Sequence, residues 1–222
     1  MTLAHSDLTT VFNMAPGCVN VLVVEPEDMF FCYACQLLSQ AENGVGEFCL
    51  AEGDKILNFA KQAVVISDYF GLRQNDKKFL TKLYQRLADT AEAEMPHEAD
   101  EVKSCVFGFL DKLNARSDCA LQYDCDAPLL SVFKAFGVTL ARDNSLLDDI
   151  LAYMKAALIL LNVRCFFFIG LKTVLTSSQI ELFYREAELL QINVFLVENV
   201  MKEKLQRECV LVIDRDLCEI IV

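Results

Sequence analysis

The chain has 222 residues, of which 54% are hydrophobic, and this is enough apolar surface for one large core or two small ones. A disordered protein is therefore excluded. The net charge of −12 also excludes a protein that coats nucleic acid with its whole surface, although a local basic groove is compatible with it. The ten cysteines lie in apolar periodic segments and no signal peptide opens the chain, so we expect a cytoplasmic protein with reduced thiols. The most apolar window, residues 156–171, is shorter than the ~20 residues of a membrane span, so we expect core and no membrane.

The first 70 residues predict strands that alternate with one long helix. An opening segment without a clear period is followed by a continuous apolar run at 18–24, which is typical of a strand buried on both faces of a parallel sheet. Pro26 and its acidic neighbours favour a helix start, and Gly44 is a usual C-terminal signal. The predicted elements are strands at 18–24, 47–51, 55–59 and 63–68, and a helix from 25–28 to 41–44.

From about residue 75 the apolar residues recur at helical spacing, with one interruption at Met95-Pro96-His97. Two long helices are therefore expected on either side of this break. Residues 121–124 and 138–141 could form short paired strands that flank a helix from about 128 to 136. A further helix, capped by Asn144 or Ser145, should run to about residue 161.

The clearest pattern is a strand, a helix and a parallel strand between residues 163 and 197. Residues 163–169 and 193–197 are apolar runs, and Thr176 and Gln179 have the spacing of a capping box at the start of the intervening helix. Such a unit is one step of a wound sheet. A polar helical connection at about 200–207 and strands at 209–213 and 218–221 are expected to follow.

We therefore predict an α/β protein in two parts. Residues 1–70 and 155–222 form a head with a mostly parallel wound sheet, of the kind that binds nucleotides but without a phosphate loop. Residues 71–154 form an α-helical arm inserted in the head.

No local motif specifies an enzyme. A phosphate cradle needs glycines, whereas Glu25-Pro26-Glu27-Asp28 follows the first buried strand. Gly170-Leu-Lys172-Thr173 superficially resembles the end of a phosphate loop but lacks the earlier glycine, and Asp68 stands where an NTPase would hold magnesium. Cys32 and Cys35 have the spacing of a redox or metal pair, but no second pair accompanies them, so buried structural thiols are the favoured interpretation.

Acidic residues cluster around position 125. Asp124 and Asp126, with Asp111 and Asp118 upstream, are oxygen ligands of the kind that a hard cation such as Ca²⁺ prefers. Spacing alone favours a solvated acidic loop over a metal site.

Several segments together form an ordered pattern. Leu121-Gln-Tyr-Asp124 is followed by an aliphatic helix and then by Phe133-Lys134-Ala-Phe-Gly137-Val138, which makes a Leu-x-Tyr-Asp strand, an amphipathic helix and a Lys-x-x-Gly-Val exit. No segment is diagnostic alone, so the specificity lies in the ordered set. Its other members are residues 21–25, 63–68, 175–176 and 212–217.

This set resembles the Csn-two family, the small DNA-end-binding adaptation proteins of type II-A CRISPR systems, over nearly the whole chain. The resemblance implies a cytoplasmic homotetramer without enzymatic activity, a ring of α/β heads with helical arms around a central hole. Such a ring threads onto the ends of double-stranded DNA through lysines in the hole and is steadied by Ca²⁺. It assists spacer acquisition beside the adaptation integrase proteins and the type II effector nuclease.

The resemblance also implies roles for particular residues. Lys134 matches the family motif and is the expected DNA-binding lysine. Asp124 matches a calcium-binding carboxylate and Asp126 takes the place of a neighbouring one, whereas Gln122 and Ser131 stand where relatives commonly have acids. Further DNA-binding candidates on the arm, for which a solvated helix face is the alternative, are Lys103, Lys112 and Arg116.

Two other classes of function stay open at this point. One is a degenerate NTPase or nuclease with the same wound fold, which a bound nucleotide or metal-dependent turnover would reveal. The other is a protein-interaction scaffold with no affinity for DNA.

Overall fold

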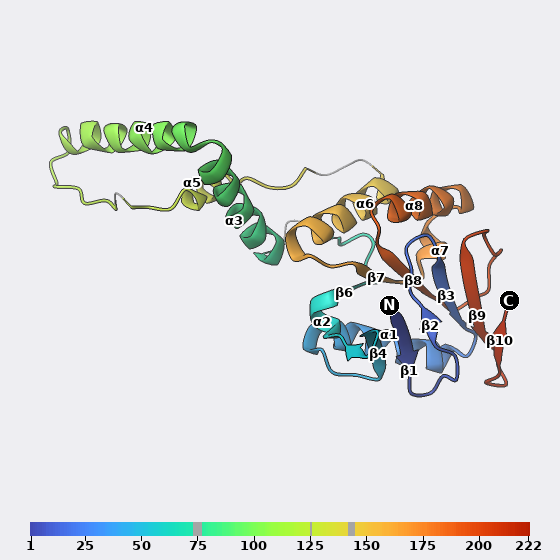
Figure 1. The fold of residues 1–222 in the computed structure, drawn as a ribbon. Coiled ribbons are helices and arrows are strands. Elements are labelled where there is room, and N and C mark those ends of the chain that lie inside the picture. Colours follow the sequence, from blue (N-terminus) through green and yellow to red (C-terminus); the bar gives the residue numbers. More distant parts are fainter. Residues whose placement is uncertain (73–76, 125, 142–144) are drawn as a thin grey trace. The chain divides into compact units, whose positions relative to one another are not determined.

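The computed structural model describes residues 1–72, 77–124, 126–141 and 145–222 (Figure 1). It divides the chain into two compact units, unit 1 with Met1–Leu72 and Arg142–Val222 and unit 2 with Arg73–Ala141. This division differs from the predicted head and arm in one element, helix α6 (Leu146–Ala156), which lies in unit 1. The physical reason is that α6 packs against helix α8 (Ser177–Leu189) and buries its apolar face in unit 1.

Unit 1 is built on a six-stranded sheet of order β10-β9-β3-β8-β7-β6. Strands β9, β3, β8, β7 and β6 are parallel to one another, and β10 pairs antiparallel with β9 at one edge. The mostly parallel, wound α/β sheet that the sequence predicts is thereby confirmed. The strands are β3 (Val19–Val24), β6 (Ala63–Ile66), β7 (Cys165–Ile169), β8 (Asn193–Glu198), β9 (Glu208–Ile213) and β10 (Glu219–Ile221).

The predicted strand-helix-strand unit is β7, α8 and β8. Helix α8 begins with the expected capping box, in which the Thr176 side chain accepts from the Gln179 amide and the Gln179 side chain accepts from the Thr176 amide. Helix α6 is capped by Ser145 and continues as a π-helix (Ala157–Leu161) that ends at Asn162 in the left-handed region. Helices α6 and α8 lie over one face of the sheet (Figure 1), with the short α7 (Leu171–Val174) beside β8.

Helix α1 (Glu27–Asn43) and a small antiparallel sheet lie over the other face (Figure 1). The opening segment, for which the sequence predicts no strand, supplies β1 and β2 of this sheet. Strands of four and two residues are too short for a period to show, and their burial comes from contacts with distant parts of the chain. The elements on this side are β1 (Thr2–His5), β2 (Phe12–Asn13), β4 (Phe48–Glu52), β5 (Lys55–Ile56) and α2 (Phe59–Gln62).

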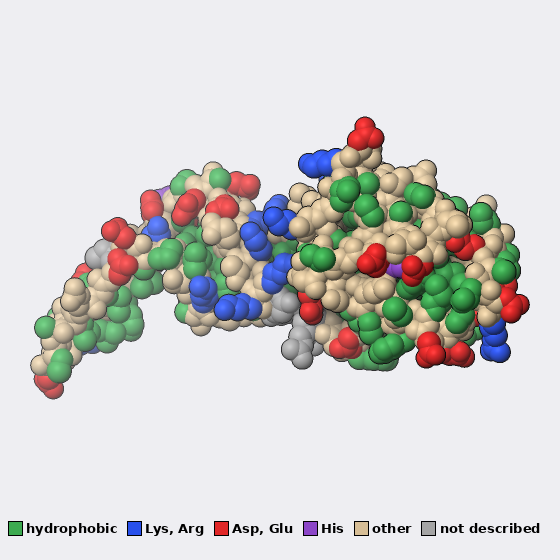
Figure 2. Space-filling model, turned by 90° about the horizontal axis from the view of Figure 1, so that it is seen from below, with side chains coloured by type: hydrophobic (Ala, Val, Ile, Leu, Met, Phe, Trp, Pro, Cys, Tyr) green, Lys and Arg blue, Asp and Glu red, His purple; other side chains and the backbone are tan. Residues whose placement is uncertain are grey.

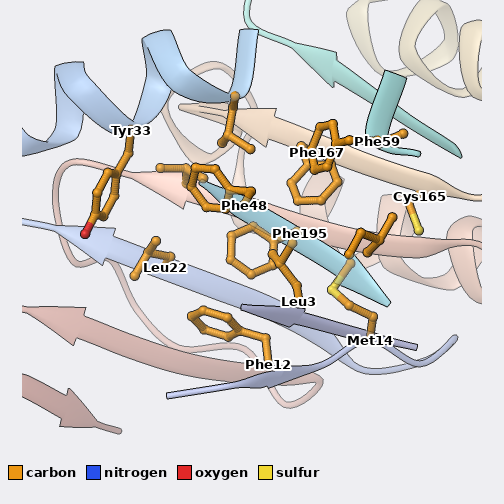
Figure 3. Close-up of a cluster of buried hydrophobic side chains, with 14 of the residues drawn as sticks. Leu3, Phe12, Met14, Leu22, Tyr33, Phe48, Phe59, Cys165, Phe167 and Phe195 are labelled. Carbon is orange, nitrogen blue, oxygen red and sulfur yellow. The ribbon is translucent and has the colours of Figure 1, made fainter. Parts of the chain in front are cut away.

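Aromatic rings fill the space between the two sheets (Figure 3). The ring of Phe195 on β8 lies 4.8 Å from Phe12 and 5.5 Å from Phe167, measured between centroids, and Phe59 lies 4.9 Å from Phe167. On the opposite face, Phe168 meets Phe183 of α8 edge to face at 5.1 Å. Successive residues of β7 therefore point into two different cores, as a strand buried on both faces must do.

Unit 2 consists of helices α3 (Lys77–Glu94), α4 (Pro96–Asn114) and α5 (Leu130–Ala135). The break between α3 and α4 falls at Met95, as predicted, and α3 packs against both α4 and α5. The strands expected at 121–124 and 138–141 were wrong, because unit 2 contains no strand among its described residues.

Residues 121–124 lie along α4 instead. The Leu121 amide donates to Asn114 Oδ1 at 2.9 Å, the Tyr123 hydroxyl donates to Asp111, and the Tyr123 ring stacks on Phe107. The helical connection expected at 200–207 was also wrong. Its backbone and side chains bond to other elements, as when Lys204 Nζ donates to the Val222 carbonyl at 2.6 Å.

Candidate functional site

The carboxyl edge of the parallel sheet is the first place to look for a ligand site. In wound sheets, ligands bind beyond the carboxyl ends of the strands where the strand order reverses, which here is beside β3. The chain itself uses the polar groups at this edge. The Glu25 amide donates to the Ile213 carbonyl at 3.0 Å, and Asn199 Nδ2 donates to the Val24 carbonyl at 2.9 Å. These groups hold β3, β8 and β9 together rather than face a phosphate.

Lys172, which follows Gly170 as a lysine does at the end of a phosphate loop, forms a buried ion pair. Its side chain is 7% exposed, and Nζ lies 2.7 and 2.8 Å from the two carboxylate oxygens of Glu208 at the start of β9. The Tyr184 hydroxyl donates to the same carboxylate at 2.6 Å. A phosphate-loop lysine must present its ammonium to a ligand, and this one is buried among protein groups.

Glu198, at the end of β8, completes the buried polar cluster. Its carboxylate accepts a hydrogen bond from the Lys172 amide at 2.9 Å. Burial raises the pKa of Glu198 to about 7, and it outweighs the Lys172 hydrogen bond and the charges of Lys172 and Lys202, which lower the pKa. Burial likewise raises the pKa of Tyr184, beside Glu208.

The acidic residues predicted to bind Ca²⁺ are in unit 2. Asp124 and Asp126 are exposed, and Asp124 Oδ1 accepts the Asp126 amide at 2.9 Å, while Cys125 between them lies outside the described residues. Within the described parts of the chain, no three acidic, histidine or cysteine side chains converge in a way that could hold a metal ion. Ca²⁺ takes roughly six to eight oxygens, so these two carboxylates would supply only part of its ligands.

The predicted DNA-binding cations are not gathered at one place. Lys134 is exposed on α5, which packs against α3. Lys112 and Arg116 are exposed, the first in the last turn of α4 and the second just after its C-terminal end. Lys103 is half-buried and lines an apolar pocket of about 260 Å³ between α4 and the segment that leads into α5, so its stem packs against protein.

A row of cations on α3 was missed by the sequence analysis. Lys78, Lys82 and Arg86 are spaced by four residues, so they share one face of the helix, and all three are exposed. None of them forms an ion pair with a side chain in the described residues. Figure 2 shows Lys and Arg side chains gathered where α3 lies. The four-residue spacing was visible in the sequence, but only the structure shows that these cations have no acidic partner among the described residues. We call these three residues the α3 stripe.

Helix α4 carries a partly exposed apolar row, whose first residues line an apolar pocket together with residues of α3 and α5. Met95, Val102, Val106, Phe109 and Leu113 follow one another at intervals of three or four residues when the buried Ala99 is included. This is the spacing of a coiled-coil seam, and Phe109 is 61% exposed. An exposed row of this length on a helix is unusual unless another surface covers it.

The thiol pair on α1 differs from its prediction. Cys32 and Cys35 are both exposed, so they are not the buried structural thiols that the sequence favoured. The reason is that α1 buries Tyr33, Leu37 and Gln40, which lie on another face of the helix.

Fold and site together define a protein with two units. One is a wound α/β unit in which the lysine at the phosphate-loop position is paired with a buried carboxylate, and the other is a helical unit with a basic face. A comparison with protein families identifies it further. The family CRISPR-associated protein (Cas_Csn2), which belongs to type II-A CRISPR systems, matches residues 40–217, and the chain belongs to this family. A search of curated proteins found no match. Among the described residues, no helix is both long and apolar enough to cross a membrane.

Replacing Lys172 by methionine should destabilise unit 1. The change leaves the Glu208 carboxylate buried without its cation, and we expect a loss of about 3 to 5 kcal/mol in the free energy of unfolding, measured by denaturant titration. Lys172→Met/Glu208→Gln should recover much of this loss. The control is Lys155→Met, which removes a partly exposed ion pair with Glu186 and should cost at most about 1 kcal/mol. Two results together would reassign Lys172 to catalysis. The Lys172→Met variant would have to be as stable as the wild type, and it would have to lose an ATP hydrolysis activity that the wild type shows.

Glu198 should make stability fall as the pH rises. Because its folded-state pKa is raised from 4.5 to about 7, its contribution is fully present below about pH 4.5 and is lost as the pH rises through 7. Glu198→Gln keeps the acceptor for the Lys172 amide. Its free energy of unfolding relative to the wild type should therefore increase by about 2 to 3 kcal/mol between pH 5 and 8. Unfolding curves at several pH values measure this gain, with the exposed Glu181→Gln as the control. Parallel pH profiles of Glu198→Gln and wild type would show that Glu198 is ionised in the folded state throughout this range.

Proposed function

We propose that this protein binds the ends of double-stranded DNA as a homotetrameric ring and assists spacer acquisition in CRISPR adaptation, without catalysing a reaction itself. The observation that carries the proposal is the α3 stripe, a set of exposed cations that form no ion pair within the described parts of a chain whose net charge is −12. Family membership supports the CRISPR-associated role. The assignment to DNA rests on the chemistry of the stripe.

The spacing of the α3 stripe suits a phosphate backbone. Residues four apart on a helix are separated by roughly 6 Å along its axis. Each DNA strand carries one phosphate for about every 3.4 Å of the duplex axis, so a row of cations with this spacing can lie close to several phosphates. Contacts of this kind fix the position of a protein on DNA without reading its bases. Binding to ends of any sequence is therefore the activity that these residues support.

Symmetry would overcome the unfavourable net charge. A single acidic chain repels DNA on average, but a closed ring copies each cation four times around one hole. The apolar row on α4 supports self-association, because exposed side chains with this spacing gain stability when another copy covers them. We place the ring in the cytoplasm, where its partners are the adaptation integrase proteins and the type II effector nuclease.

We also propose Ca²⁺ as a structural ion of the assembled ring, held by Asp124 and Asp126. Support comes from their exposure next to Tyr123, which is fixed on α4 through Asp111 and Phe107. The two carboxylates of one chain are too few, so oxygen ligands from another copy must complete the site. The ion would add positive charge at a contact between acidic chains.

The alternative of an NTPase has less support. The group that would bind phosphate, Lys172, is paired inside unit 1 with Glu208, whose carboxylate also accepts from the Tyr184 hydroxyl. A scaffold without DNA affinity leaves the exposed cations of the α3 stripe without a role, and the DNA experiment below decides between these functions.

Substitutions in the α3 stripe should change the salt dependence of DNA binding. If about two basic residues of each protomer face the hole, roughly eight phosphates are contacted, and the slope of log affinity against log salt is near −7. Lys82→Ala or Lys134→Ala removes four of these charges from a tetramer and should flatten the slope by about 3 to 4 units, as measured by fluorescence anisotropy with linear duplex.

Lys61→Ala in unit 1 is the matched control, because it removes an exposed lysine and thus the same net charge from each chain. An equal effect of Lys61→Ala would mean that total charge, and not the stripe, governs binding. A ring must be threaded, so a closed circular duplex of the same sequence should bind far more weakly than the linear form. Equal affinity for both forms would contradict a ring on DNA ends. If neither form binds, the protein-interaction scaffold without DNA affinity is the favoured function.

Removing the two carboxylates should abolish calcium binding and weaken the assembly. Asp124→Ala/Asp126→Ala should show no calcium heat in titration calorimetry, while Asp100→Ala, an exposed acid of α4 outside this cluster, should bind as the wild type does. Mass measurement in solution with and without chelator tests whether the ion holds the tetramer. An unchanged calcium affinity of the double variant would make this segment a solvated acidic loop.

A further inference from the structure

Two thiols that are far apart in the sequence meet at the start of two neighbouring strands of unit 1. Cys18 directly precedes β3 and Cys209 is the second residue of β9, and their Sγ atoms lie 3.0 Å apart although 191 positions separate them. The backbone on both sides is fixed, because β3 and β9 pair in parallel from Val19 and Glu208 onward and the Val19 amide donates to the Arg207 carbonyl at 2.9 Å. The sheet itself therefore holds these thiols together.

The pair lies in the wall of an open pocket of about 420 Å³. The pocket is bounded by β2, the starts of β3 and β9, and the C-terminal residues Ile221 and Val222. Cys209 is exposed and Cys18 is half-buried, so a small molecule in the pocket reaches Cys209 first. Burial and the hydrogen bond with Cys209 raise the pKa of Cys18 to about 11, which keeps Cys18 a protonated thiol at neutral pH.

We propose that Cys18 and Cys209 form a reversible disulfide, and that this pocket is a redox-modification site whose oxidant is a low-molecular-weight disulfide such as oxidised glutathione. The two sulfurs need to approach by about 1 Å to reach the length of a disulfide bond, which is near 2.05 Å. Rotation of the two side chains can supply this movement while the strands stay paired. The site is independent of the DNA-binding residues, all of which are in unit 2.

The exchange proceeds in two balanced steps. The Cys209 thiolate attacks one sulfur of the small disulfide, which forms a mixed disulfide at Cys209 and releases one small thiolate that takes up a proton. Cys18 then loses its proton to solvent and attacks Sγ of Cys209, and the second small thiol leaves. Two protein thiols are thereby oxidised to one disulfide and one small disulfide is reduced to two thiols. In a reducing cytoplasm the pair stays open, and it closes when the glutathione pool becomes oxidised.

The test uses the full chain, folded, with oxidised glutathione as the oxidant. After remaining thiols are blocked, mass spectrometry of the digest should find a Cys18–Cys209 cross-linked peptide that dithiothreitol removes. The second step should accelerate as the pH rises from 7 to 9, because only the Cys18 thiolate attacks. Cys32→Ser/Cys35→Ser, which removes the exposed pair on α1, should leave the cross-link unchanged.

Two single variants separate the steps. Cys18→Ser should stop at a stable glutathione adduct on Cys209, and Cys209→Ser should give neither the cross-link nor that adduct. The proposal is overturned if the wild type accumulates only the Cys209 adduct, or if Cys18 and Cys209 are found linked between two different chains rather than within one. A glutathione adduct that forms on Cys18 as fast in Cys209→Ser as on Cys209 in Cys18→Ser would overturn the order of the two steps.

Discussion

Burial of both faces of the central parallel strands is the constraint on which the rest of unit 1 depends. Phe166 and Phe168 of β7 point to the side of α6 and α8, and Phe167 points to α1 and the small sheet. A strand of this kind has no face for water, so the chain must supply cover on both sides. Helices α6 and α8 cover one face of the sheet. The other face is covered by α1 together with β1, β2 and β4, which explains why the opening residues fold back onto the sheet.

The same sheet determines where unit 2 enters the chain. Strands β6 and β7 are neighbours, with Ala63 opposite Cys165, yet unit 2 lies between them in the sequence. The insertion leaves and rejoins unit 1 between two adjacent strands, so the parallel pairing is preserved whatever the inserted segment does. Unit 1 can therefore carry a helical unit of a different character, whose polar and apolar faces are not needed for the sheet.

Particular cations of the two units have different surroundings. In unit 1 the wound fold has the topology of a ligand-binding sheet, but Lys172, Glu208 and Tyr184 satisfy one another inside it. A buried lysine with a carboxylate partner is part of the internal structure and is not available to bind a ligand. In unit 2 the cations of the α3 stripe face solvent without acidic partners among the described residues, and an anion can replace water around them at little cost. The two units therefore differ in these particular cations, because Lys172 is paired inside unit 1 whereas the α3 stripe is exposed to solvent.

The sequence by itself determined those elements whose signals are local. The apolar runs of β3, β7 and β8, the capping box of α8 at Thr176 and the break at Met95 all depend on residues close together in the chain, and the structure confirms them. Only the tertiary structure decided features that depend on distant partners. Strand β1 exists because β4 pairs with it, residues 121–124 bind along α4 rather than pair as a strand, and α6 joins unit 1 through α8. The contacts of Lys172 with Glu208 and of Cys18 with Cys209 belong to the same class. No period or spacing reports them, because the chain must first be folded before the two side chains are neighbours.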